Sequence, residues 1–274
     1  MLRTDVTFRR LTVADLDRCT ALAADRGWAP EEEKWRFLLT VGEGYGIDDP
    51  DGRLAGAFVL TRHGPDLAAI SMVLVAARYG RRGLGQRMMT HALEQAGGAT
   101  TFLCATEIGR PVYERVGFTT VGSVTAHRGQ YRPDPDLRAD VRPLHDGLTV
   151  AALDRDVFGA DRAGLDRLPV FAERARVAAD GTGYAASWRN GSTLMLGPVV
   201  AGDLDGARAV VDAVASGEPA PVRLDVPGHQ PEFAAWVVER GLAPYFTVAF
   251  MVHGGKALPG DRSRLFALFM QALG

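Results

Sequence analysis

The stretch ISMVLVAARYGRRGLGQRMMTHALEQA, residues 70–96, determines the expected fold. Residues 70–75 are a short apolar run with two valines, which favours a buried strand over a helix. After Gly85 the apolar residues recur every three or four positions, so they share one face of a helix that stops at Gly97 and Gly98. The sequence therefore predicts a strand joined by a basic, glycine-rich turn to a helix that begins near residues 83–84.

This turn has the composition of an anion-binding site. Gly80, Gly83 and Gly85 have no side chains that would keep a ligand away from the backbone N–H groups. A helix start also offers unpaired donors and the positive end of the helix dipole, so a phosphate is the expected occupant. Three arginines add positive charge, namely Arg78, Arg81 and Arg82. The alternative is a solvated basic turn whose glycines are there for steric reasons.

The sequence of this turn does not match two common phosphate-binding loops. A Walker loop ends in Gly-Lys-Ser/Thr, whereas Gly85 is followed by Gln86 and Arg87. A dinucleotide fingerprint needs a third glycine where Met88 stands. Neither a nucleoside triphosphatase nor a dinucleotide-dependent enzyme is therefore predicted.

The spelling Gly80-Arg81-Arg82-Gly83-Leu84-Gly85 resembles the pyrophosphate loop of the GCN5-related N-acetyltransferase (GNAT) superfamily, Gln/Arg-x-x-Gly-x-Gly/Ala. Gly80 departs from the pattern, and Arg78 or Arg81 could replace the missing side-chain contact. The resemblance implies an α+β fold, a mixed α/β sheet, with acetyl-CoA as co-substrate. It implies these cofactor-binding residues: Val73, Leu74 and Val75 for the pantetheine arm, Gly80, Arg81, Arg82, Gly83, Leu84, Gly85 and Gln86 for the pyrophosphate, and Thr106 and Tyr113.

A second stretch, TFLCATEIGRPVYERVGF at residues 101–118, predicts a strand, a loop and a short helix that opens near Pro111 and stops at Gly117. The GNAT superfamily has a similar element with a tyrosine four residues before a Gly-Phe pair, and Tyr113 stands at that position. The resemblance makes Tyr113 the candidate general acid that protonates the departing thiolate. A phenol with an ordinary pKa of about 10 can do so at neutral pH. The alternative is an aromatic side chain that only packs in the core.

The acceptor side is less clearly marked. The region before the central strand covers the acceptor site in the superfamily, and the strand itself continues that site. This implies the candidates Trp28, Glu31, Glu32, Trp35, Ser71 and Met72. The alternative is that the glutamates begin a solvated helix and the tryptophans pack. The central strand reads Ser71-Met72-Val73 and has no acid, so no general base is assigned; His63, His91 and His127 are possible substitutes that more often pack.

Composition excludes several classes of function. The chain has 274 residues, a net charge of −2 and interspersed charges, so neither a nucleic-acid surface nor a polybasic membrane anchor is expected. No apolar run is long enough to span a membrane and the first residues lack the core of a signal peptide, so a cytoplasmic location is expected. Cys19 and Cys104 are expected to be reduced core thiols. No metal is predicted, because no histidines or acids have ligand spacing.

The chain reads as a tandem repeat. Residues 132–140, RPDPDLRAD, contain two prolines and five charged residues, a composition that predicts a linker. The domains are therefore expected at 1–132 and 141–274, with residues 133–140 between them. FRRLTVADL (8–16) is echoed by VRPLHDGL (141–148), and VYERVGF (112–118) by VVERGL (237–242). The second copy has Asp203 and Asp205 where a phosphate loop should lie, and Val237 in place of the tyrosine. It resembles the degenerate second domain of bacterial two-domain GNAT proteins, which would close the acceptor pocket or support a homodimer.

These observations predict an N-acetyltransferase in which a primary amine of a small-molecule acceptor attacks acetyl-CoA directly. The first alternative is a non-catalytic acyl-CoA-binding regulatory module, which the missing strand carboxylate favours and Tyr113 opposes. The second is a mycothiol-synthase-like tandem enzyme, in which the second copy would be the active one. The acceptor, the acyl chain length and the oligomeric state stay open.

Overall fold

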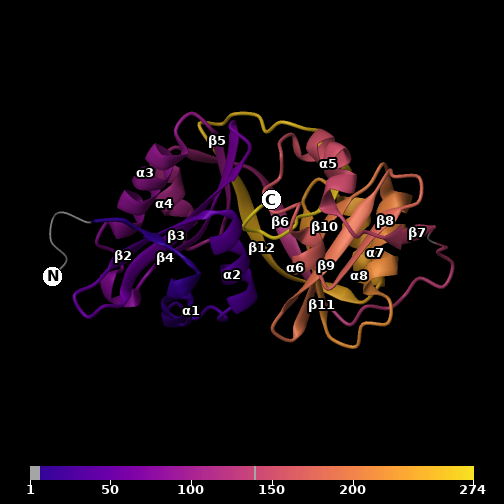
Figure 1. Cartoon of the computed structure of the whole chain (residues 1–274), viewed down its shortest axis with the longest axis horizontal. Coiled ribbons are helices and arrows are strands. Elements are labelled where there is room, and N and C mark those ends of the chain that lie inside the picture. Colours follow the sequence, from indigo (N-terminus) through magenta and orange to yellow (C-terminus); the bar gives the residue numbers. More distant parts are fainter. Residues whose placement is uncertain (1–6, 139) are drawn as a thin grey trace.

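The computed structural model describes residues 7–138 and 140–274. Figure 1 shows two lobes that share strands at the centre of the molecule. The first half of the chain contains β1 (Arg9–Leu11), α1 (Leu16–Asp25), α2 (Glu32–Val41), β2 (Glu43–Asp48), β3 (Leu54–His63), β4 (Leu67–Val75), α3 (Leu84–Ala96), β5 (Thr100–Ala105), α4 (Arg110–Arg115) and β6 (Phe118–Gly129). The pattern of residues 6–11 predicts a strand, of which the structure forms β1 at Arg9–Leu11; residue 6 lies outside the described part of the chain.

The second half repeats this order. It contains β7 (Val141–Pro143), α5 (Ala151–Phe158), α6 (Leu168–Phe171), β8 (Arg174–Ala178), β9 (Tyr184–Asn190), β10 (Thr193–Val200), α7 (Leu204–Ala215), β11 (Val222–Pro227), α8 (Pro231–Glu239), β12 (Leu242–His253) and β13 (Leu265–Ala267). The unit β4-α3-β5-α4-β6 therefore has a counterpart in β10-α7-β11-α8-β12. The tandem repeat and the mixed sheet predicted from the sequence are confirmed.

The two halves exchange their last long strands. The sheet has the order β1-β2-β3-β4-β5-β12-β6-β11-β10-β9-β8-β7, so β12 lies between β5 and β6, and β6 lies between β12 and β11. Cys104 of β5 pairs with Phe250 of β12, and Ala126 of β6 pairs with Asp225 of β11. One continuous sheet therefore runs through both lobes (Figure 1).

The central strands β4 and β5 separate part of the way along. They pair in parallel at residues 67–69 and 100–102, and beyond that point β5 pairs only with β12 on its other side. β4 is irregular here, because its register against β3 shifts and Met72 has a φ of 51°, which is unusual for a residue with a side chain. Residues 70–75 therefore face an opening between the two strands.

Helices fix the position of this opening. Met88, Met89 and Ala92 of α3 are fully buried, which confirms the predicted apolar face of that helix. Trp35 and Leu38 of α2 are also fully buried, so this helix is held against the sheet by the hydrophobic effect. The opening therefore lies between rigid elements.

Candidate functional site

A cleft of about 430 Å³ occupies the opening between β4 and β5. It lies within the size range of small-molecule sites, roughly 300–1,000 Å³. The cleft brings together most of the residues that the sequence nominated: Trp28, residues 71–75, Gly80, Arg81, residues 83–86, Thr106 and Tyr113. These residues come from the α1–α2 connection, β4, the following turn, the start of α3, the end of β5 and α4.

Four of the nominated donor-site and acceptor-site residues, namely Glu31, Glu32, Trp35 and Arg82, lie away from the cleft wall. Arg82 is exposed on the turn and is not among the lining residues. Glu32 is exposed and pairs with Arg36 at 2.7 Å on the surface of α2. Trp35 is fully buried in the hydrophobic core, and its side chain does not line the cleft.

The basic turn forms the anion-binding geometry expected from its glycines. α3 begins at Leu84, and its N-cap Gly83 has φ 75°, a left-handed conformation that glycine adopts without strain. Within the described residues, no protein acceptor receives the backbone N–H groups of residues 83–86. These donors and the positive end of the α3 dipole therefore meet at the edge of the cleft. Arg81 also lines the cleft next to these N–H groups, and its backbone has a left-handed conformation with φ 58°.

Arg78 does not line the cleft, although the sequence allowed it to replace the side-chain contact that is missing at Gly80. Its guanidinium forms an ion pair with the fully buried carboxylate of Asp49 and lies 5.0 Å from the centre of the Tyr79 ring. Burial alone would raise the pKa of Asp49, but the hydrogen bonds from Arg78 and from the N–H groups of Arg53 and Asp51 hold that pKa below its ordinary value. Arg78 therefore anchors the turn to the β2–β3 connection.

Replacing Arg78 by methionine is expected to lower the free energy of unfolding by about 2 kcal/mol near neutral pH, because a buried carboxylate loses its charged partner. Asp49 has a depressed pKa in the folded state, so its stabilisation is present above its unfolded pKa of about 3.9 and is lost as the pH falls. The difference between the variant and wild type should therefore shrink below about pH 4. Urea unfolding at several pH values would measure it.

Arg53 supplies a matched control for this variant. It approaches the same Asp49 carboxylate at 4.0 Å, but its side chain is 64% exposed. Arg53→Met should cost less than about 0.5 kcal/mol, since exposed pairs contribute little. Equal losses in the two variants would contradict the role given to Arg78.

Tyr113 forms part of the cleft wall on α4. Only 8% of the residue is exposed, its ring meets Phe118 edge to face, and burial raises the pKa of its hydroxyl to about 12. Gly109 makes room for the ring, because a Cβ there would lie 3.0 Å from Cε2 of Tyr113 and 3.2 Å from its hydroxyl. The hydroxyl is therefore a protonated donor held against a cleft at neutral pH.

Two further side chains reach the cleft from the strands. Cys104 lines it, but burial and, next, the Asp225 carboxylate raise the pKa of its thiol, which disfavours the thiolate needed for nucleophilic attack. The hydroxyl oxygen of Ser71 is buried and has no protein partner among the described residues. A buried hydroxyl without a partner is costly, so Ser71 is suited to bind a ligand atom.

The cleft also contains residues that the sequence did not nominate, including Arg26, Tyr79, Ile108, Gly109 and Arg115. Gly109 was accessible to sequence reasoning, because it precedes the short helix whose tyrosine needs space. The others come together only through the fold. Arg26, for example, follows the end of α1 and lies in the same wall as residues of α4.

The corresponding opening in the second half is filled by the chain itself. β10 and β11 pair in parallel at residues 194–196 and 222–224, and β13 then pairs with β10 at Val199 and Val200. The Leu268 N–H donates to the carbonyl of Asp225 on β11 at 3.0 Å. Asp203 caps α7 by accepting from the Gly206 N–H at 2.8 Å, as its position in the sequence predicted. This opening therefore offers neither free strand edges nor a free cationic helix start.

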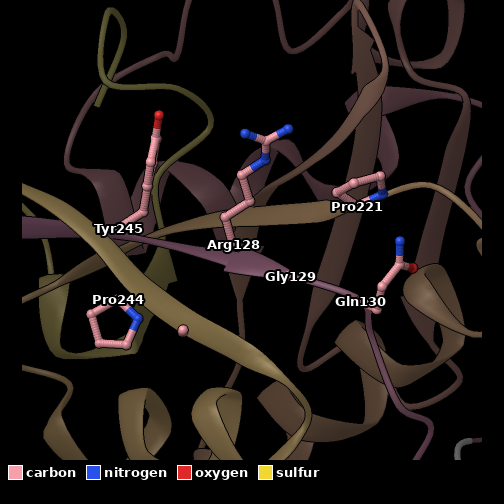
Figure 2. A pocket seen from close by; sticks show the side chains of 7 residues that line it. Arg128, Gly129, Gln130, Pro221, Pro244 and Tyr245 are labelled. Atoms are coloured by element: carbon pink, nitrogen blue, oxygen red, sulfur yellow. The ribbon is translucent and has the colours of Figure 1, made fainter.

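The other pockets of the described chain have fewer features of a binding site. A shallow pocket of about 350 Å³ lies between the end of β6, the start of β12 and Pro221. Figure 2 shows Arg128 and Tyr245 extending in the same direction from these two strands. Arg128 already donates to Thr193 at 3.0 Å. Within residues 7–138 and 140–274, no three or more His, Cys, Asp or Glu side chains are grouped as metal ligands, and no helix is both long and apolar enough to cross a membrane.

Comparison with known proteins assigns a class to this fold and site. Residues 12–118 match the model of the acetyltransferase (GNAT) family, and residues 150–267 match that of an acetyltransferase (GNAT) domain. The computed structure is similar to a presumed acetyltransferase from Pyrococcus horikoshii, with a TM-score of 0.85 and 18% identity over 100% of this chain and 98% of the other. It is also similar to a tandem GNAT protein from the clavulanic acid biosynthesis pathway, with a TM-score of 0.64 and 18% identity over 92% and 100% of the two chains. These structural likenesses show the tandem fold.

A sequence relative places the chain within that class. The uncharacterised N-acetyltransferase YitH of Bacillus subtilis is 30% identical over 264 residues, covering 92% of this chain and 93% of its own length. The chain therefore belongs to the GNAT family and is an acetyltransferase with two tandem domains. The enzyme class and the tandem arrangement predicted from the sequence are confirmed.

Proposed function

We propose that the protein transfers an acetyl group from acetyl-CoA to a primary amine of a small molecule in the cleft between β4 and β5. The observation that carries the proposal is the combination of free N–H donors at residues 83–86 with Tyr113 in the wall of the same cleft. A fit to coenzyme A is supported by the separated strands, which leave residues 70–75 without a partner strand on the cleft side. The first half of the chain is therefore the catalytic one, with the division into domains at residues 133–140.

The chain would bind the donor through its backbone. The N–H groups at the start of α3 would receive the pyrophosphate, and Arg81 would add positive charge beside them. The free edge of β4 around Val73 and Val75 would pair with the amides of the pantetheine arm, with Thr106 on the opposite wall. Thr106 Oγ1 accepts from the Gly109 N–H at 3.3 Å, so it would keep one acceptor site and its O–H donor for the arm.

Tyr113 would supply the proton that the reaction needs. The neutral amine nitrogen attacks the thioester carbon, the carbon–sulfur bond breaks, and the Tyr113 hydroxyl gives its proton to the departing sulfur. The phenolate then recovers a proton from solvent, and the new amide loses the extra proton of its nitrogen to solvent. β4 provides no carboxylate for this last transfer, so no general base is assigned. A strand N–H and the Ser71 hydroxyl are the available donors for the developing oxyanion.

The second half would close the acceptor side. Glu31, at the start of α2, accepts a hydrogen bond from Asn190 at 2.8 Å, and Asn190 belongs to the β9–β10 hairpin of the second half. Burial alone would raise the pKa of Glu31, but Lys34 at 3.0 Å and the Asn190 amide hold it below its ordinary value. The α1–α2 connection, which carries Trp28 to the cleft, is thereby tied to the second half. Support of a homodimer is the second role that we propose for the second half.

Asn190→Ala is expected to raise the acceptor KM about fivefold, because one hydrogen bond of about 1 kcal/mol that positions the α2 start is lost. The Kd of acetyl-CoA should stay unchanged, since the bond is remote from residues 83–86. Ser192→Ala, in the exposed part of the same hairpin, is the control and should alter neither constant. A larger effect on acetyl-CoA than on the acceptor would contradict the proposed closure.

The direct test is an acetyl-transfer assay with a panel of primary amines that includes polyamines, amino acids and aminoglycosides. Release of the coenzyme A thiol together with an acetylated product detected by mass spectrometry would support the proposal. The second candidate function, a regulatory module that binds acyl-CoA without turnover, is favoured by the missing carboxylate on β4. Tight acetyl-CoA binding without product from any amine, and with Tyr113→Phe indistinguishable from wild type, would favour that module.

A further inference from the structure

A further cavity of about 480 Å³, partly open to solvent, lies between the start of β6, the end of β11 and the C-terminal segment. Its wall is mainly apolar, with Val121, Val124, Phe250, Leu265 and Leu268 as the large contributors. None of its lining residues belongs to the cleft described above. Its volume lies within the range of small-molecule sites, roughly 300–1,000 Å³.

One cationic side chain, Arg262, lines this cavity without a carboxylate partner. Its Nε donates to the carbonyl of Pro259 at 3.2 Å and its Nη2 to that of Phe158 at 3.0 Å. Its guanidinium carbon lies 4.6 Å from the centre of the Phe158 ring and 5.9 Å from that of Phe102. Among the described residues, no acid forms an ion pair with Arg262, and its Nη1 has no hydrogen-bond acceptor.

The surroundings make this positive charge unfavourable as it stands. Burial, and then the nearby Arg162, lower the pKa of Arg262 to about 9. Arg264, two residues along the chain, shows the usual alternative, since it pairs with Asp156 at 2.7 Å and lies outside the cavity wall. No acidic residue lines the cavity, all of whose lining residues lie in the described part of the chain. Arg262 is half-buried, and a charge held partly away from water without a carboxylate partner is stabilised by an anion that brings its own apolar body.

We propose that this cavity is a binding site for an aliphatic monocarboxylate, with the carboxylate on Arg262 and the alkyl chain among the apolar side chains of β6, β12 and the C-terminal segment. With Nε and one N–H of Nη2 engaged by carbonyls, the N–H groups of Nη1 and the second N–H of Nη2 are the parallel donors left for a carboxylate. Each methylene of the alkyl chain that leaves water adds hydrophobic stabilisation. The site is separate from acetyl transfer and stands whether or not the proposed function is correct.

Calorimetric titration of the full chain with sodium decanoate tests the proposal. Wild type is expected to bind decanoate, and Arg262→Gln to bind it at least about tenfold more weakly. Arg264→Gln is the matched control and should bind like wild type. Decanol, which has the chain without the charge, should bind at least about tenfold more weakly than decanoate.

A second variant guards against misfolding of Arg262→Gln. A Cβ at Gly122 has open space around it and Gly122 lines the cavity, so Gly122→Phe should fill the cavity and abolish decanoate binding without strain. Both variants should keep the wild-type affinity for acetyl-CoA, which reports on the separate cleft. The proposal is overturned if wild type does not bind decanoate, if decanol binds equally well, or if a folded Arg262→Gln or Gly122→Phe retains wild-type affinity.

Discussion

Tyr113→Phe is expected to lower kcat by about 10²-fold or more, because general acid catalysis contributes roughly 10²–10⁴-fold to reactions of this kind. The Kd of acetyl-CoA should change little, since the ring and its contact with Phe118 remain. Steady-state kinetics with saturating acceptor, together with calorimetric binding of acetyl-CoA, would separate the two effects. Burial raises the pKa of the hydroxyl to about 12, so ionisation of Tyr113 should not limit wild-type activity near neutral pH.

Tyr79→Phe is the matched control for this variant. Tyr79 lines the same cleft and is 9% exposed, nearly as buried as Tyr113, but it belongs to the turn after β4 and lies next to Arg78. Removal of its hydroxyl should leave kcat within about threefold of wild type, as expected of a group outside the proton path. A Tyr113→Phe enzyme that is as active as Tyr79→Phe would disprove the assignment of the general acid.

Gly83→Asp is expected to weaken acetyl-CoA binding by about 100-fold. A carboxylate at the anion-binding helix start repels the pyrophosphate by about 1 kcal/mol, and it competes for the N–H donors that would bind the pyrophosphate, which costs a further ~1–2 kcal/mol. About 1.4 kcal/mol corresponds to a tenfold change in Kd, so the sum gives this estimate. Calorimetric titration with acetyl-CoA would measure it directly.

Gly83→Asn separates the effect of the negative charge on acetyl-CoA binding from the effect of adding a side chain at residue 83. Asparagine has almost the same shape as aspartate and tolerates the left-handed region, and a Cβ at residue 83 meets no atom within 4 Å. Gly83→Asn should therefore bind acetyl-CoA clearly better than Gly83→Asp. If both variants bind like wild type, the turn does not hold the pyrophosphate and the donor site lies elsewhere.

The local features of the first half could be predicted because neighbouring residues decide them. The helix start at Leu84, the helix with Pro111 in its first turn, and the stop at Gly117 with φ 95° follow from glycine, proline and apolar spacing. The acceptor candidates were harder to place. Trp35 and Trp28 lie near each other in sequence, yet the first is fully buried and the second is 37% exposed in the cleft. Helical period identifies a buried face but not which of two aromatic side chains reaches a cavity.

The sequence by itself determined the tandem α/β architecture, the glycine-rich turn at residues 80–85 and the position of Tyr113, because each depends on short-range pattern. The tertiary structure alone decided the exchange of β6 and β12, the pairing of Arg78 with Asp49 and the filling of the second opening by β13. These features join residues far apart in the chain, and strand pairing between distant segments leaves no local periodic signal. The cavity around Arg262 belongs to the same group, since its walls come from three distant segments that only the folded sheet brings together.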